Sequence, residues 1–152
     1  MNLKKLTIRQ ILEKYEFPHR FLVYFASQCA KDAQQYNKKP DPRALKAIEI
    51  AERFGNGEEF TQEFLKETAN SANAAYAAAY AAVNAAYAAN AAANAAANAA
   101  ASANAATYAA ANAAANAARA ADYAAAQEKY KQLLIDLIDS RLTQLERLLI
   151  FG

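Results

Sequence analysis

The sequence predicts an all-α fold, an antiparallel helical bundle in which long alanine-rich helices pack closely. About two-thirds of residues 68–118 are alanine, the best helix former, and this stretch has no glycine, proline or charged residue. The flanking segments instead repeat bulky apolar residues at helical spacing. Because an alanine methyl buries little area, the bulky anchors of the core must come from both ends of the chain. We expect one domain, with short helices within 1–57, Ala/Asn-rich helices within 58–126 and a leucine-rich helix over 127–151.

The first two helices are predicted from their start signals. Thr7 and Gln10 form a capping box, and an apolar stripe follows it. Pro18 suits the first turn of a second helix that should run to about Tyr36, before the polar loop 37–40. The expected apolar faces are Ile8, Ile11, Leu12 and Tyr15 in the first helix and Phe21, Leu22, Phe25, Ala26 and Cys29 in the second.

A third helix is predicted over 42–54, because Asp41 can cap it and Pro42 suits its first position. Its expected apolar side consists of Leu45, Ile48, Ala51 and Phe54. Gly55 is placed to close this helix as a left-handed residue, and Asn56-Gly57 to complete a tight turn. Glu58 and Glu59 would then occupy the first turn of the next helix, where its dipole favours acidic residues.

The long tract that follows has no glycine until Gly152 and no proline at all, so it gives no strong turn signal. One helix of that length would be far longer than is usual in globular proteins, and we expect the chain to fold back near 84–90 and near 102–104, where asparagine and serine compete with the helix. Two seams are expected in the tract: an aromatic one of Tyr76, Tyr80, Val83 and Tyr87, and a polar one of Asn90, Asn94 and Asn98.

The C-terminal helix has the clearest pattern of the chain. Its apolar residues alternate steps of three and four, which predicts a core or coiled-coil-like seam. That seam consists of Ile135, Ile138, Leu142, Leu145 and Leu149.

Reactive side chains are few and isolated, so we predict no catalytic, cofactor or metal site. His19 has only Glu16 nearby in sequence, and Cys29 lies on an apolar helix face. Asp136 and Asp139 have the spacing of a solvated helix face. With a single histidine, a single cysteine and no Gly-rich loop, the sequence disfavours an enzyme.

Charge and hydropathy also limit the classes of partner that the protein could bind. Acidic and basic residues are mixed, with a net charge of +2, whereas a nucleic-acid interface needs a basic stripe. The alanine tract has regularly placed asparagines, which disfavours a membrane span. One cysteine excludes an intrachain disulfide, and the N-terminal segment has charges where a secretion signal would be apolar. We therefore expect a cytoplasmic protein.

Residues 25–58 carry a family resemblance. The run Phe25-Ala26-Ser27-Gln28-Cys29-Ala30, a polar linker, and then residues 41–49 with Phe54 and Gly57-Glu58 resemble the fifth family of immunity proteins of bacterial polymorphic toxin systems. The alanine-rich helices and the return of larger side chains at 123–134 extend this resemblance, as an Ala/Asn-rich divergent member. It implies an all-helical protein that binds and neutralises a cognate toxin domain without catalysis.

Two other functions remain open from the sequence. Asn73 and Asn84, like Tyr76 and Tyr87, are separated by the 11-residue interval that is typical of alanine-rich ice-binding helices. A structural or scaffold module is the second alternative, in which the alanine faces and the terminal leucines would form a homo-oligomer. The sequence does not identify the toxin, the binding surface or the oligomeric state.

Overall fold

The computed structural model describes residues 2–36, 40–78, 91, 112–117, 119 and 123–152. These residues form helices and connecting turns without a strand, which confirms the all-α prediction. The elements are η1 (Leu3–Lys5), α1 (Ile8–Lys14), α2 (His19–Ala33), η2 (Gln34–Tyr36), α3 (Pro42–Gly55), α4 (Gln62–Ala78), α7 (Tyr123–Arg141) and α8 (Gln144–Phe151), with a further helical segment at 112–117.

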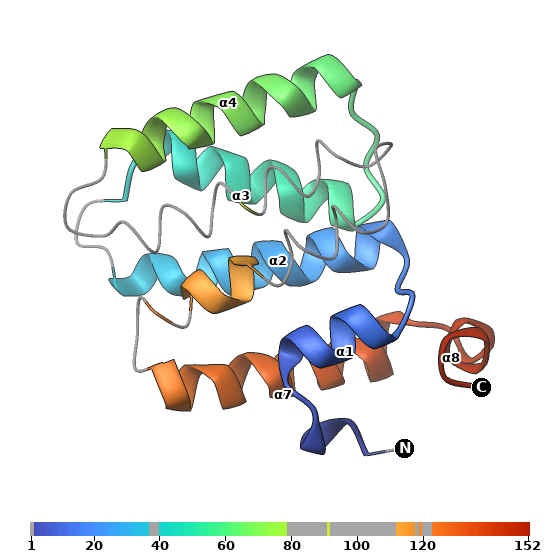
Figure 1. Ribbon diagram of the computed structural model, residues 1–152. Coiled ribbons are helices and arrows are strands. Elements are labelled where there is room, and N and C mark those ends of the chain that lie inside the picture. Colours follow the sequence, from blue (N-terminus) through green and yellow to red (C-terminus); the bar gives the residue numbers. More distant parts are fainter. Residues whose placement is uncertain (1, 37–39, 79–90, 92–111, 118, 120–122) are drawn as a thin grey trace.

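Four helices lie side by side in the order α4, α3, α2, α7, and each runs antiparallel to its neighbour (Figure 1). The short helix α1 packs along α7, and α8 turns away from α7 at the end of the molecule where both chain termini lie (Figure 1). The first and last parts of the chain therefore meet at the same end of the bundle, where Tyr15 contacts Phe151.

The predicted start signals form the expected caps. Thr7 Oγ1 accepts the Gln10 N–H at 3.1 Å, and Gln10 Oε1 accepts the Thr7 N–H at 2.9 Å. Asp41 caps α3 by accepting the Arg43 N–H at 2.8 Å. The Arg43 guanidinium and N–H together lower the pKa of Asp41.

Bulky side chains from both ends of the chain form the core, as the sequence predicts. The predicted face of α2 is fully buried, and α7 contributes Tyr130 and Leu134 at 1% and 0% exposure. Buried alanines lie between these anchors, where small side chains let helix axes approach closely. They include Ala30, Ala33, Ala44, Ala47, Ala51, Ala69, Ala72, Ala113, Ala114, Ala117 and Ala126.

The turn after α3 differs from the prediction. Gly55 lies inside the helix, and the residue with positive φ is Gly57, at +100°. The helix α4 begins at Gln62 rather than at residue 58, because Thr61 Oγ1 accepts the Phe64 N–H at 3.1 Å and so provides the cap.

The two glutamates of this turn contact arginines instead of opening a helix. Glu58 accepts from Arg53 at 2.6 Å, and this bond lowers the pKa of Glu58. Glu59 pairs with Arg20 at 3.0 Å, while Arg20 also donates to the Phe54 carbonyl at the end of α3. The positive charge of Arg20 thus lies at the negative end of the helix dipole.

The predicted C-terminal helix over 127–151 is two helices. A second capping box, Thr143 with Glu146, begins α8 after α7 has ended at Arg141. The two N–H···O bonds of this box measure 3.0 and 3.1 Å. They compete with continuation of α7, so the predicted seam is interrupted after Leu142.

The burial of the predicted apolar seam also differs from the prediction. Ile138 and Leu142 are buried as predicted and Ile135 is partly buried, but Leu145 and Leu149 are 65% and 77% exposed. The buried bulky residues of α7 are Tyr130, Leu134, Leu137 and Ile138. On α3, Leu45 is also 45% exposed, so the predicted apolar face of that helix is wrong at its first member.

Several predictions concern residues outside the described ranges. These are the fold-back positions near 84–90 and 102–104, most of the aromatic seam and the whole polar seam. Among the helices that the structure does describe, none has the length and apolar content needed to cross a membrane.

Candidate functional site

The reactive side chains that the sequence singles out lie apart from one another. The His19 ring, at the start of α2, contacts Phe54 edge-on with centroids 5.8 Å apart. Asp136 accepts from Gln132 at 2.9 Å, and Asp139 pairs with Arg147 at 3.8 Å. Within the described ranges, no three His, Cys, Asp or Glu side chains are grouped as a metal site would require.

Cys29 should not react with thiol reagents while the protein is folded. Its side chain is 0% exposed, and burial, with a smaller contribution from the charge of Asp32, raises the pKa of the thiol well above its usual value. Because the thiolate is the reactive form, both effects suppress reaction. An Ellman assay at pH 8 should give almost no signal without denaturant and one thiol per chain in guanidinium chloride. Rapid labelling of the native protein would show that α2 is not packed as described.

Polar side chains link the C-terminal end of α2 to α7. Asp32 accepts from the Tyr130 hydroxyl at 2.7 Å and from Lys129 Nζ at 2.8 Å. Each of these groups thus contacts a group of opposite charge or a hydrogen-bonding partner. The cluster therefore joins two residues, Asp32 and Lys129, that lie 97 positions apart in sequence. Its charges are used in contacts between helices and are not directed at a substrate.

A second polar contact lies beside it. Glu52 accepts from Gln28 at 2.7 Å and from Lys31 at 3.1 Å. Partial burial would raise the pKa of Glu52, but the hydrogen bonds from Gln28 and Lys31 outweigh burial and lower the pKa. The ionised carboxylate is thus the form that the fold stabilises at neutral pH.

The most unusual surface of the described chain is on α8. Leu145, Leu148 and Leu149 are 65%, 63% and 77% exposed, and we call these three residues the leucine surface. At helical spacing they share one side of α8, a helix of eight residues. Grouped exposed leucines are typical of a binding surface, whereas single exposed leucines are ordinary.

The opposite side of α8 holds the helix against the bundle. Phe151 contacts Tyr15 and Phe17, with ring centroids 4.8 and 6.0 Å apart, and Ile150 packs against the same core. Edge-to-face ring pairs of this kind stabilise by about 0.5–1.5 kcal/mol beyond their buried area. The leucine surface is therefore carried on an anchored helix, not on a free end.

The sequence pattern missed this surface because it assigned Leu145 and Leu149 to the core seam. The signal that corrects the assignment is present in the chain, since Thr143-x-x-Glu146 is a capping box. A new helix axis changes which residues face the core. Only the folded position of Phe151 on Tyr15 shows which side that is.

The chain was compared with protein-family models, with curated proteins and with solved structures, and none matches. The resemblance to immunity proteins therefore stays a prediction from residues 25–58.

Proposed function

We propose that this chain is a non-catalytic protein-binding module that neutralises a cognate bacterial toxin domain in the cytoplasm, and that the leucine surface contacts the toxin. The observation that supports binding is the exposure of Leu145, Leu148 and Leu149 on an anchored helix. Exposed apolar side chains on a rigid element lose little conformational entropy when a partner covers them. The resemblance of residues 25–58 supports a toxin as that partner.

Several residues that carry the resemblance are buried and act as scaffold in this proposal, whereas others, such as Leu45, are exposed. Phe25, Ala26, Cys29 and Ala30 are 0% exposed in α2, and Ala47 is 0% exposed in α3. They pack the α2–α3 hairpin and do not reach a partner. The part of the chain that contacts a toxin therefore has to be sought elsewhere, and the leucine surface is the strongest apolar candidate among the described residues.

A second copy of the chain fits this surface less well. Antiparallel pairing of α8 with itself would bring Glu146 of both copies to the same edge of the contact, where like charges repel. Three leucine side chains also cover less than the about 800 Å² that a stable complex buries on each partner. The leucine surface would thus form the centre of a larger interface with a different protein.

A triple variant should abolish toxin neutralisation while leaving the fold intact. It replaces Leu145, Leu148 and Leu149 by serine. Truncating a central apolar contact weakens binding by at least about 1 kcal/mol, so we expect three to weaken it by a hundredfold or more. The assay is a pull-down with toxins encoded by neighbouring genes, followed by rescue of cells that express the captured toxin. Leu45→Ser is the matched control, because Leu45 is exposed on α3 and lies outside the leucine surface.

Two results would contradict the proposal. Equal rescue by the triple variant and by Leu45→Ser would remove the leucine surface from the interface. If the unaltered chain neither binds nor protects against any neighbouring toxin, the proposal that its partner is a toxin is wrong. Light scattering over a range of concentrations tests the scaffold alternative, since a homo-oligomer that dissociates in the triple variant would show that α8 pairs with itself.

A further inference from the structure

A cavity of about 420 Å³ lies between α1, α7 and the residues Ala114, Ala115 and Arg119. Three parts of the chain meet there: the start of α1, the residues Ala114, Ala115 and Arg119, and the first half of α7. Its volume falls in the range of about 300–1,000 Å³ that is usual for small-molecule sites. The alanine-rich tract and the charged terminal parts of the sequence therefore both contribute residues to this cavity.

The charges that line this cavity are unbalanced. Arg9, Arg119 and Lys131 bring three positive charges, and Glu128 brings the single negative one. The whole chain carries a net charge of only +2, whereas the cavity lining has two more positive than negative side chains. A concave surface with excess positive charge focuses its field on an anion that enters.

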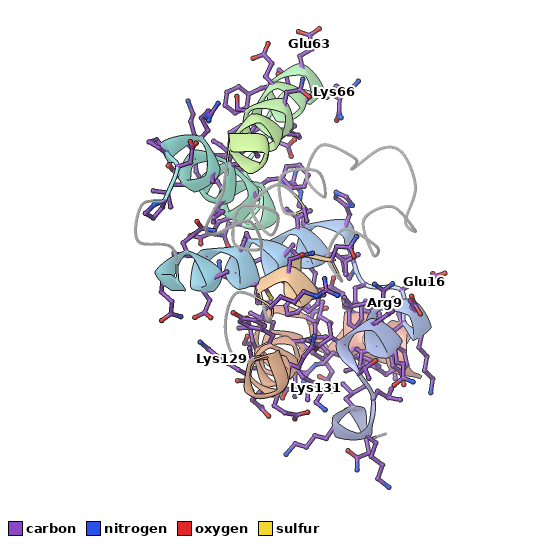
Figure 2. The ribbon with its side chains drawn as sticks, turned by 60° about the vertical axis from the view of Figure 1, so that its left-hand side comes forward. Arg9, Glu16, Glu63, Lys66, Lys129 and Lys131 are labelled. Carbon is purple, nitrogen blue, oxygen red and sulfur yellow. The ribbon has the colours of Figure 1, made fainter. Side chains whose placement is uncertain are left out.

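Lys131 is held in place before any ligand arrives. Its Nζ donates to the Lys4 carbonyl at 3.0 Å and contacts Glu128 Oε1 at 3.1 Å, and its side chain is 14% exposed. Lys131 and Lys129 leave α7 on different sides, with Lys131 toward α1, the helix that carries Arg9 (Figure 2). An ammonium fixed in this way needs little reorganisation to meet an anion.

The two arginines are more exposed to solvent than Lys131. Arg9 lies 3.4 Å from Glu13, an exposed pair whose carboxylate is outside the cavity lining. Arg119 is exposed and forms no ion pair with any carboxylate that the structure describes. Guanidinium groups match the oxygens of a phosphate with two parallel hydrogen bonds.

The remaining lining is uncharged, and it includes the polar side chains of Thr7 and Gln127. Ile8, Ala114 and Ala115 present methyl groups beside the cations. A ligand that fits therefore combines an anionic group with a small uncharged body. We propose that this cavity binds a small phosphate monoester, with Arg9, Arg119 and Lys131 at the phosphate and the alanine wall against the organic part.

The test is an isothermal titration of the full chain with a nucleoside 5′-monophosphate, with inorganic phosphate and with the nucleoside alone. We expect the monophosphate to bind, inorganic phosphate to bind more weakly and the nucleoside not to bind. Affinity should fall as salt is raised, because charge supplies much of the attraction. Absence of binding by both phosphates at millimolar concentration would overturn the proposal, as would equal binding of monophosphate and nucleoside.

Charge-matched variants locate the site. Arg119→Gln and Arg9→Gln should each weaken monophosphate binding about tenfold, because each removes a charge-assisted contact. Lys46→Gln removes the same charge from an exposed position on α3, outside the cavity, and should change affinity little. Equal loss in all three variants would indicate general electrostatic attraction and would reject the cavity. Toxin binding through α8 is measured separately, so neither result decides the other.

Discussion

Gly55→Ala is expected to destabilise the protein by about 2–3 kcal/mol, although alanine is the better helix former. A Cβ added at Gly55 would lie 2.7 Å from Tyr24 Cβ, 2.8 Å from its Cα and 2.9 Å from its N. Two of these three atoms are backbone, so no side-chain rotation relieves the overlap and α2 must move away from α3. Helix propensity favours alanine by about 1 kcal/mol. Overpacking of a close contact typically costs 1–3 kcal/mol or more, and separating two backbones lies at the upper end of that range.

Moving α2 from α3 also disturbs α7. The Arg141 guanidinium stacks on the Tyr24 ring, with its Cζ 3.6 Å from the ring centroid, and donates to Asn56 Oδ1 at 2.7 Å. Arg141 thus contacts both Tyr24, whose backbone the new methyl would meet, and Asn56, the residue after Gly55. The substitution therefore affects three helices rather than one.

Gly57→Ala is the matched control for Gly55→Ala. Gly57 has a φ of +100°, but an added Cβ would meet no atom within 4 Å. Its expected penalty of about 1–2 kcal/mol comes from backbone strain alone. Urea unfolding of both variants gives the comparison. A Gly55→Ala protein as stable as the unaltered chain would show that α2 and α3 do not approach as closely as the structure indicates.

The role of Gly55 shows where sequence reasoning succeeds and where it fails. A glycine after Phe54 predicts a helix end, and the helix does end there, at Gly55 itself. What local sequence cannot supply is the neighbour on α2 that requires a residue without a Cβ. The left-handed residue falls two positions later, at Gly57.

The same distinction holds for the rest of the fold. Caps and apolar stripes are local, so Thr7, Asp41 and the face of α2 are predicted correctly. Long-range contacts leave no local signal, so neither the Asp32–Lys129 pair nor the cavity at Arg119 can be predicted from spacing. The exposed leucines of α8 were misassigned because a regular seam outweighed the capping box that interrupts it.

Tyr130→Ala is expected to destabilise the protein by about 4 kcal/mol. Tyr130 is 1% exposed on α7, and deleting a buried aromatic side chain costs about 3–5 kcal/mol through lost contacts and the remaining cavity. Its hydroxyl also donates to Asp32 Oδ2 at 2.7 Å, a part-buried hydrogen bond that links α7 to α2.

Two milder variants separate the ring from the hydroxyl. Tyr130→Phe keeps the packing and removes only the bond to Asp32, and a hydrogen bond to a charged group contributes about 1.5–3 kcal/mol. Lys129→Ala removes the other donor to Asp32, but the Lys129 side chain is 54% exposed and the pair with Asp32 should contribute under about 1 kcal/mol. We therefore expect the order of destabilisation Tyr130→Ala, Tyr130→Phe, Lys129→Ala in chemical unfolding.

The order matters because it tells which contact holds α7 against α2. If Tyr130→Phe is as stable as the unaltered chain while Lys129→Ala is not, the exposed ammonium rather than the buried hydroxyl determines the interaction with Asp32. A double variant completes the test. Because both donors share one carboxylate, the two losses should not add, and the second donor removed should cost more than it does alone, since it then leaves a half-buried charge without either hydrogen bond.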